Sequence, residues 1–269
     1  MIGKMAKTVI GIIIFLVLAV TTQIGAISFL LALVMCRFLP FKGVAVQLTL
    51  NVALYTLLTF AIVPHVAPYF GREPIAITSQ LKPTNYWLTY GLNRQYVTPE
   101  LNSVLAEIST EFQQRHPTAV VNFLDAGFPF IKHYPLLPHL SHHDGRKVDL
   151  SFFYLTADGK ATPHKPSRSG YGIFENPHNN EKDTTAFCKA HGYFQYDYPK
   201  YLTLGVPYPN LKFDEVLNRN LISVIVSHPN IGKVFIEPHL RTRLGLSHPR
   251  IRFHGCGAVR HDDHIHLQL

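Results

Sequence analysis

The feature that most constrains this chain is the absence of charge from most of its first quarter. No charged residue occurs from residue 8 to residue 36, or from residue 43 to residue 63. Each stretch is long enough to cross the hydrocarbon core of a bilayer, which takes roughly 20 apolar residues. The segment between them contains Pro40, which is typical of a helix end. The sequence therefore predicts a hairpin of two transmembrane helices over residues 1–70, followed by one domain over residues 71–269.

A cleaved signal peptide is the alternative for the first stretch. Lys4 and Lys7 would form its basic start, residues 9–20 its apolar centre, and Gly25-Ala26 a cleavage site with small residues. The residues after Ala26 are still apolar, so the second stretch keeps the chain attached to the membrane in either case.

Charge alone leaves the orientation of the hairpin open. With two retained helices, the domain lies on the same side of the membrane as Lys4 and Lys7, while the hairpin loop carries Arg37 and Lys42. Basic residues favour the cytoplasmic side. Two basic residues on each side therefore decide nothing.

The remaining composition sets weaker limits. The net charge of +8 comes without a long basic run or a nucleic-acid-binding motif, so no nucleic-acid partner is expected. Cys36 lies in the apolar quarter, whereas Cys188 and Cys256 could form a disulfide in an oxidising compartment. Two cysteines without geometry do not decide whether they pair.

The domain is predicted to be α+β, with a small antiparallel sheet and flanking helices that carry a metal site. Thr98-Pro99-Glu100 begins a helix, because threonine caps and proline and glutamate suit a first turn. Residues 157–208 lack a periodic pattern, and they either frame a substrate cleft or form a surface insertion. The other expected elements are a linker over 64–98, strands at 119–124, 148–154, 234–236, 251–253 and 264–269, and helices at 215–228 and 237–244.

Two segments carry most of the residues that can bind a metal. Histidine and aspartate are ligand types of a catalytic zinc ion, which keeps three protein ligands and leaves one position for water. The segments are Pro138-His139-Leu140-Ser141-His142-His143-Asp144-Gly145-Arg146-Lys147-Val148-Asp149-Leu150 and His261-Asp262-Asp263-His264-Ile265-His266.

The spacing within these segments allows them to converge. Alternate side chains of a strand share a face, so His264 and His266 project from the same face. Gly145 permits a tight turn that brings His142 over the start of the strand with Asp149. If the strands of Asp149 and His266 are neighbours, His142, Asp149 and His266 form a three-ligand site. A histidine pair in a strand is more often structural, and only the two segments together favour a metal site.

The two segments together resemble the lysostaphin, D-Ala-D-Ala-peptidase and hedgehog group of zinc proteins. The histidine three residues before His142 and the ending from His261 to His266 are most similar to the penicillin-insensitive murein endopeptidase branch. The resemblance covers about residues 122–155 and 234–269, and it leaves the hairpin and residues 157–208 unexplained. The residues that carry it are His142-His143-Asp144-Gly145-Arg146-Lys147-Val148-Asp149 and His264-Ile265-His266.

The resemblance implies a single Zn²⁺ ion and a role for each nearby residue. His264 would assist the water that zinc activates, and Asp263 competes for this role because it lies three residues before His266. The implied zinc ligands are His142, Asp149 and His266; His261 and His139 lie near the site; and His143 and Asp144 are spacers that face solvent.

The implied function is that of a membrane-anchored zinc metallopeptidase which hydrolyses the peptide cross-links of peptidoglycan, as a D,D- or L,D-endopeptidase. Such a substrate lies outside the cytoplasm. The domain is therefore expected on the periplasmic or outer side of a bacterial inner membrane, with Arg37 and Lys42 inside. The alternatives are a D,D-carboxypeptidase or dipeptidase on short D-peptides, and a non-catalytic zinc-binding module. The expected partners are peptidoglycan peptides and the lipid bilayer.

Overall fold

The computed structural model describes residues 2–41, 43–137 and 139–269, with side chains from residue 5 onward. Lys42 and Pro138 lie outside the described residues, as does the side chain of Lys4. Of the four basic residues Lys4, Lys7, Arg37 and Lys42, the structure therefore describes the side chains of Lys7 and Arg37.

The apolar quarter forms three helical segments where the sequence predicts two. α1 (Ile2–Thr22) and α2 (Ile24–Phe38) pack against each other and are separated by Gln23, whose backbone is left-handed with φ 62°. This conformation breaks the helix. The Gln23 side chain accepts a hydrogen bond of 3.0 Å from the Phe130 backbone N–H. That contact with the domain is not visible in the hydrophobic pattern, which continues through the break.

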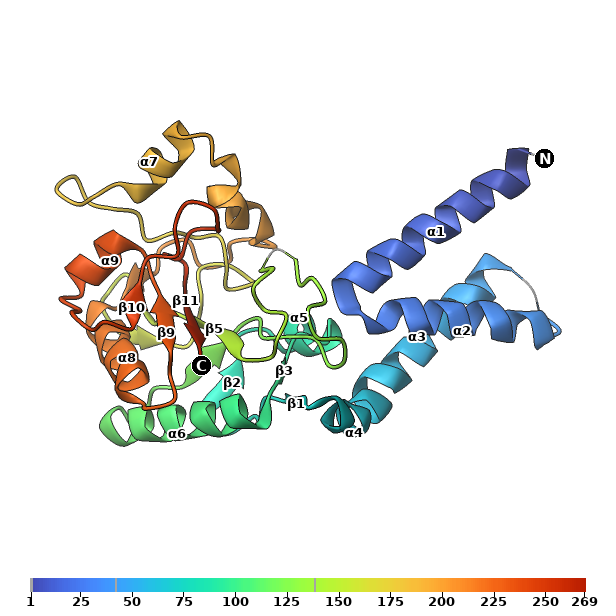
Figure 1. Ribbon diagram of the computed structural model, residues 1–269, viewed down its shortest axis with the longest axis horizontal. Coiled ribbons are helices and arrows are strands. Elements are labelled where there is room, and N and C mark those ends of the chain that lie inside the picture. The colour runs from blue at the N-terminus through green and yellow to red at the C-terminus, as the bar shows by residue number, and fades with distance from the viewer. Residues whose placement is uncertain (1, 42, 138) are drawn as a thin grey trace.

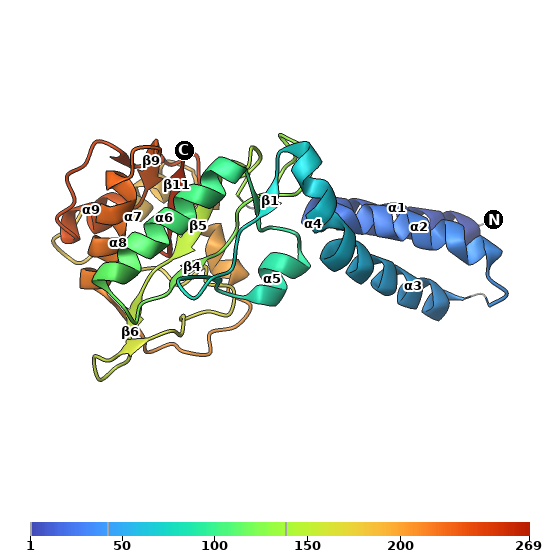
Figure 2. The same ribbon diagram turned by 90° about the horizontal axis from the view of Figure 1, so that it is seen from below.

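The third segment is a continuous helical rod that leads into the domain. It consists of α3 (Val44–Leu57), the π-helical turn η1 (Leu58–Ile62), α4 (Val63–Val66) and the 3₁₀ turn η2 (Ala67–Phe70). Two helices, Met5–Thr22 and Val44–Phe70, are long and apolar enough to cross a membrane, and α2 is a shorter apolar helix. The start of α1 and the end of α2 both lie at the end of the molecule that is remote from the domain (Figures 1 and 2).

The domain is α+β and is built on a six-stranded mixed sheet. The strands lie in the order β10-β9-β11-β5-β4-β2. The central pairs are antiparallel, as expected, but β10–β9 and β2–β4 at the two edges are parallel. The strands are β2 (Leu81–Pro83), β4 (Val121–Phe123), β5 (Lys147–Ser151), β9 (Lys233–Phe235), β10 (Ile251–Arg252) and β11 (His264–Gln268).

One face of this sheet is the main hydrophobic core. α6 (Pro99–Arg115) begins at Thr98, whose side chain caps the Leu101 N–H as the sequence predicts, and it packs against α8 (Glu215–Ser227). Apolar side chains of both helices join those of β5 and β11 in a single buried cluster. The alternate residues of β5 and β11 therefore project from the opposite face, where the candidate ligands lie.

The segment 64–98, expected as a linker that wraps onto the domain, contributes a strand to the main sheet. It contains β2, which forms an edge of the main sheet, because the backbone of residues 81–83 pairs with β4. Two smaller sheets complete the domain, β1 (Glu73–Pro74) with β3 (Tyr96–Val97), and β7 (Ala161–Thr162) with β6 (Tyr154–Leu155) and β8 (Lys212–Phe213). The remaining helices are α5 (Tyr86–Gly91), α7 (Thr184–Ala190), η3 (Phe194–Leu202) and α9 (Pro238–Arg243).

Candidate metal centre

Pairing of β5 with β11 brings the two predicted segments together. The strands are antiparallel neighbours, and His266 lies directly opposite Asp149 in their register. His264, two residues before His266, lies opposite Ser151 on the same face. The two segments were predicted to converge if these strands are neighbours, and the strands are neighbours.

A turn at Gly145 places His142 over this pair. Gly145 has φ +72°, a backbone conformation that favours glycine, and a Cβ atom there would also displace the Arg72 guanidinium, 2.5 Å away. The His142 Nδ1 donates to the Ala126 carbonyl oxygen at 2.7 Å. This hydrogen bond orients the ring so that His142 Nε2 faces Asp149 and His266.

Three ligand atoms meet in a small triangle. His142 Nε2 lies 3.0 Å from His266 Nδ1 and 3.2 Å from Asp149 Oδ1, and His266 Nδ1 lies 2.9 Å from the same carboxylate oxygen. Atoms that bind zinc at about 2.0–2.2 Å are spaced in this way. The three residues are at most 2 % exposed. A buried His/Asp cluster of this kind can hold a metal ion, and the assignment of these three residues as ligands stays a prediction.

A second group of possible ligands overlaps the first. His139, Asp149 and His264 also lie close enough to share an ion. His139 Nδ1 is 3.1 Å from Asp149 Oδ2, and His264 Nε2 is 3.7 Å from Asp149 Oδ1. Neither ring nitrogen of His139 has a hydrogen-bond partner among the described residues. The structure thus brings His139 to the centre, as expected, and Asp149 is common to both groups.

Asp263 orients His264. Asp263 Oδ1 lies 2.5 Å from His264 Nδ1, and its other oxygen accepts a hydrogen bond of 2.6 Å from the Gly172 backbone N–H. Both carboxylate oxygens are therefore engaged. The His264 Nε2 atom is buried and has no hydrogen-bond partner in the described part of the chain, so it is available to a group bound beside Asp149.

Buried charges separate the protonation states of the histidines. Burial alone lowers the pKa of His264, but the carboxylates of Asp149 and Asp263 outweigh burial and raise this pKa to about 9. Burial lowers the pKa of His266 to about 4 and that of His261 well below its usual range. In the metal-free protein the surroundings of His264 therefore favour its protonated form, whereas those of His266 favour the neutral form that a metal ligand needs.

The other predicted site residues divide as follows. The His261 ring lies 4.9 Å from that of His264 and 5.7 Å from that of His266, so the structure brings His261 to the centre. The His143 ring instead contacts His133, with their Nδ1 atoms 3.0 Å apart. His143 and Asp144 are half-buried, so they are not the fully solvent-facing spacers that were expected.

The sequence interpretation missed the residue that holds the second oxygen of Asp149. The Tyr171 hydroxyl donates to Asp149 Oδ2 at 2.8 Å and accepts from the Asp125 backbone N–H at 3.1 Å. Tyr171 comes from the irregular segment 157–208, which the sequence left open as part of a substrate cleft or as a surface insertion. It is 5 % exposed. Part of that segment therefore covers the metal face of the sheet.

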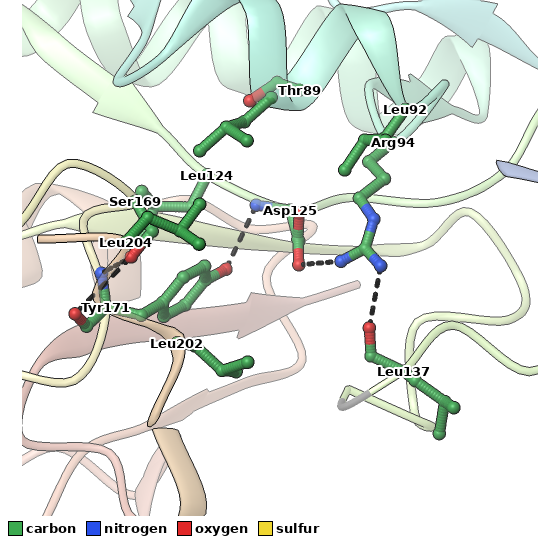
Figure 3. Close-up of a pocket in the computed structure, with 11 residues that line it drawn as sticks. Thr89, Leu92, Arg94, Leu124, Asp125, Leu137, Ser169, Tyr171, Leu202 and Leu204 are labelled. Carbon is green, nitrogen blue, oxygen red and sulfur yellow. Dashed lines mark hydrogen bonds and ion pairs between the residues drawn. The ribbon is translucent and has the colours of Figure 1, made fainter. Parts of the chain in front are cut away.

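A cavity of about 180 Å³ is lined by Asp125 and Tyr171 (Figure 3), and Tyr171 connects it to Asp149 of the candidate metal centre. Arg94 forms an ion pair of 2.8 Å with Asp125 and donates to the Leu137 carbonyl oxygen at 2.8 Å (Figure 3). The rest of the lining is mainly apolar, with six leucines: Leu88, Leu92, Leu124, Leu137, Leu202 and Leu204.

A disulfide joins two parts of the shell around the site. Cys188 of α7 and Cys256 are bonded, with Cα atoms 5.3 Å apart. The bond links the irregular segment to the loop that precedes β11. The sequence left this pairing open.

Comparisons with known proteins do not assign the chain to a family. No model of a known protein family matches it, and no curated protein is significantly similar to it. The resemblance to the lysostaphin, D-Ala-D-Ala-peptidase and hedgehog group therefore rests on the two motifs alone.

Proposed function

We propose that this protein is a membrane-anchored zinc hydrolase that cleaves amide bonds in peptidoglycan peptides, most directly the cross-links. The observation that carries the proposal is the convergence of His142, Asp149 and His266, with His264 beside Asp149. Two histidines and one carboxylate are a donor set that zinc accepts. Zinc bound there would polarise the scissile carbonyl and supply a nucleophilic water at neutral pH.

The roles of the protein groups follow from their contacts. His142, Asp149 and His266 would hold the ion. His264, fixed by Asp263 and carrying a proton on Nε2, would donate a hydrogen bond to the negative charge that develops on the carbonyl oxygen and could pass a proton to the leaving amine. Both oxygens of Asp263 are already engaged in hydrogen bonds. These contacts favour a role for Asp263 in positioning His264 and disfavour a role as the catalytic base.

We also propose that the domain lies outside the cytoplasm. The ends of α1 and α2 that carry Lys7 and Arg37 are both remote from the domain (Figures 1 and 2). Three crossings, with α2 as the second, would leave these basic residues in the cytoplasm in agreement with the positive-inside rule. The equal number of basic residues on the two sides, which left the orientation of a two-helix hairpin open, no longer applies to three crossings. The Cys188–Cys256 disulfide supports the same orientation, since such bonds persist in oxidising compartments.

A non-catalytic zinc module is the second candidate, because the three proposed ligands are almost fully buried. In such a module His264 would be a fourth ligand, and structural zinc sites are closed in this way. The variant His264→Ala separates the two functions. A hydrolase should keep its zinc and lose cleavage, whereas a structural site should lose zinc affinity.

The decisive experiment uses the full chain in detergent with zinc and cross-linked muropeptides. We expect metal-dependent cleavage of the cross-link, lost in His142→Ala and His266→Ala and retained in the matched control His143→Ala. Release of terminal D-alanine from linear peptides instead would indicate the carboxypeptidase alternative. Cleavage that survives removal of His142 would refute the proposed site.

A further inference from the structure

Helix α5 presents aromatic side chains to the outside of the molecule. Trp87 is 73 % exposed and Tyr86 is 42 % exposed, and the two rings lie 5.5 Å apart. Trp87 is the single tryptophan of the sequence. Trp87 and Tyr86 thus form an exposed aromatic pair on a short helix, and the contacts of that helix decide what can cover the pair.

The membrane helices fix the position of α5. The Trp87 ring lies 6.4 Å from that of Phe60, and the Tyr55 hydroxyl donates to the Gly91 carbonyl oxygen at 2.5 Å. The Asn93 side chain donates to Thr59 Oγ1 at 3.1 Å. These contacts lie along α3 and η1, within the segment that is long and apolar enough to cross a membrane.

The depth of α5 follows from the rise of the helix. Phe60 is 16 residues beyond Val44, and at 1.5 Å per residue this is about 24 Å along the axis. The hydrocarbon core of a bilayer is about 30 Å thick. If that core begins near Val44, then Trp87, in contact with Phe60, lies near its outer boundary. Gln23, where α1 ends, is also next to the domain.

We propose that α5 lies in the interfacial layer of the bilayer, with Trp87 and Tyr86 among the lipid headgroups. Tryptophan and tyrosine favour this layer because their rings are apolar and carry a polar group. Helix α5 also supplies Leu88 and Thr89 to the cavity beside the candidate metal centre, and Leu92, which follows the helix, lines the same cavity. The interfacial contact would thus hold that cavity at the membrane surface. The proposal rests on insertion of α3 into the membrane and is independent of any hydrolase activity.

The single tryptophan allows a test on the unaltered chain. The full-length protein is reconstituted into phosphatidylcholine vesicles that contain lipids brominated either near the headgroup or near the end of the acyl chain. We expect a blue-shifted Trp87 emission and a loss of fluorescence that is larger with bromine near the headgroup. Flotation of the vesicles with the protein checks insertion separately.

A relocated tryptophan provides the matched control. Phe187 is 52 % exposed on α7, which lies at the opposite end of the domain from α1 and α3 (Figures 1 and 2). In Trp87→Phe with Phe187→Trp, brominated lipids should have no effect, whereas iodide in water should quench strongly. The proposal would be overturned if the protein floats with the vesicles but brominated lipids do not quench Trp87. It would also be overturned if these lipids quench the tryptophan equally at residues 87 and 187. Failure to float would refute membrane insertion itself, and no outcome depends on cleavage.

Discussion

Removal of the Tyr171 hydroxyl should weaken metal binding without touching any proposed ligand. In Tyr171→Phe, Asp149 Oδ2 loses a hydrogen bond of 2.8 Å, and the Asp125 N–H loses its acceptor at 3.1 Å. Loss of a group that orients a metal ligand typically costs 10- to 100-fold in affinity, which is about 1.4–2.8 kcal/mol. The unpaired, buried Asp125 N–H costs a further 1–3 kcal/mol or so of folding stability.

These two effects can be separated with a matched variant. Tyr196 is also fully buried, and its hydroxyl donates to the buried Glu237 carboxylate at 2.7 Å. Glu237 does not belong to either group of possible metal ligands. Tyr196→Phe should therefore lower the free energy of unfolding by a similar amount and leave zinc affinity nearly unchanged.

The assay is a competitive titration of zinc against a chromogenic chelator, with urea unfolding of the metal-free protein measured in parallel. The expected result is a 10- to 100-fold larger zinc Kd for Tyr171→Phe alone. An equal loss of affinity in both variants would mean that general destabilisation is the cause. Unchanged affinity in Tyr171→Phe would refute the claim that this hydroxyl orients Asp149.

Three further predictions concern stability. Burial lowers the pKa of Lys165 from 10.5 to about 7. Between these pH values, unfolding takes up a proton. The free energy of unfolding should therefore rise with pH across that window, by at most about 5 kcal/mol. Lys165→Met should remove this rise in pH-dependent urea unfolding, and identical profiles would contradict it. Gly145→Ala should lower the free energy of unfolding in urea by about 1–2 kcal/mol, because alanine would have to adopt φ +72° there; an unchanged free energy would refute this. Joint replacement of Cys188 and Cys256 by Ser opens a loop with a sequence separation of 68, which should cost about 4 kcal/mol by calorimetry; an unchanged Tm would contradict it.

The local elements of this domain were predictable because their signals are local. Thr98 caps α6 as its position before Pro99 and Glu100 predicts, and the alternation of β5 puts Val148 and Leu150 in the core with Asp149 on the other face. The helix α8 likewise begins after Asp214. Capping, period and turn chemistry act over a few residues, so they can be read from the sequence alone.

The apolar quarter shows where such signals end. Its composition determined that the segment is helical and suited to a membrane, but the break at Gln23 depends on a hydrogen bond from Phe130, more than a hundred residues away. The hydrophobicity of the sequence does not show where the chain reverses direction between two apolar helices. The number of segments, and with it the basis for orienting the domain, therefore came from the tertiary structure.

The candidate site divides in the same way. The sequence by itself determined that His142, Asp149, His264 and His266 have the chemistry of a metal site, because residue type and spacing are local properties. Only the tertiary structure paired β5 with β11 in the register that opposes His266 to Asp149, and only it brought Tyr171 to the second carboxylate oxygen. Strand register and the path of an irregular segment depend on contacts between distant residues, which no local pattern encodes.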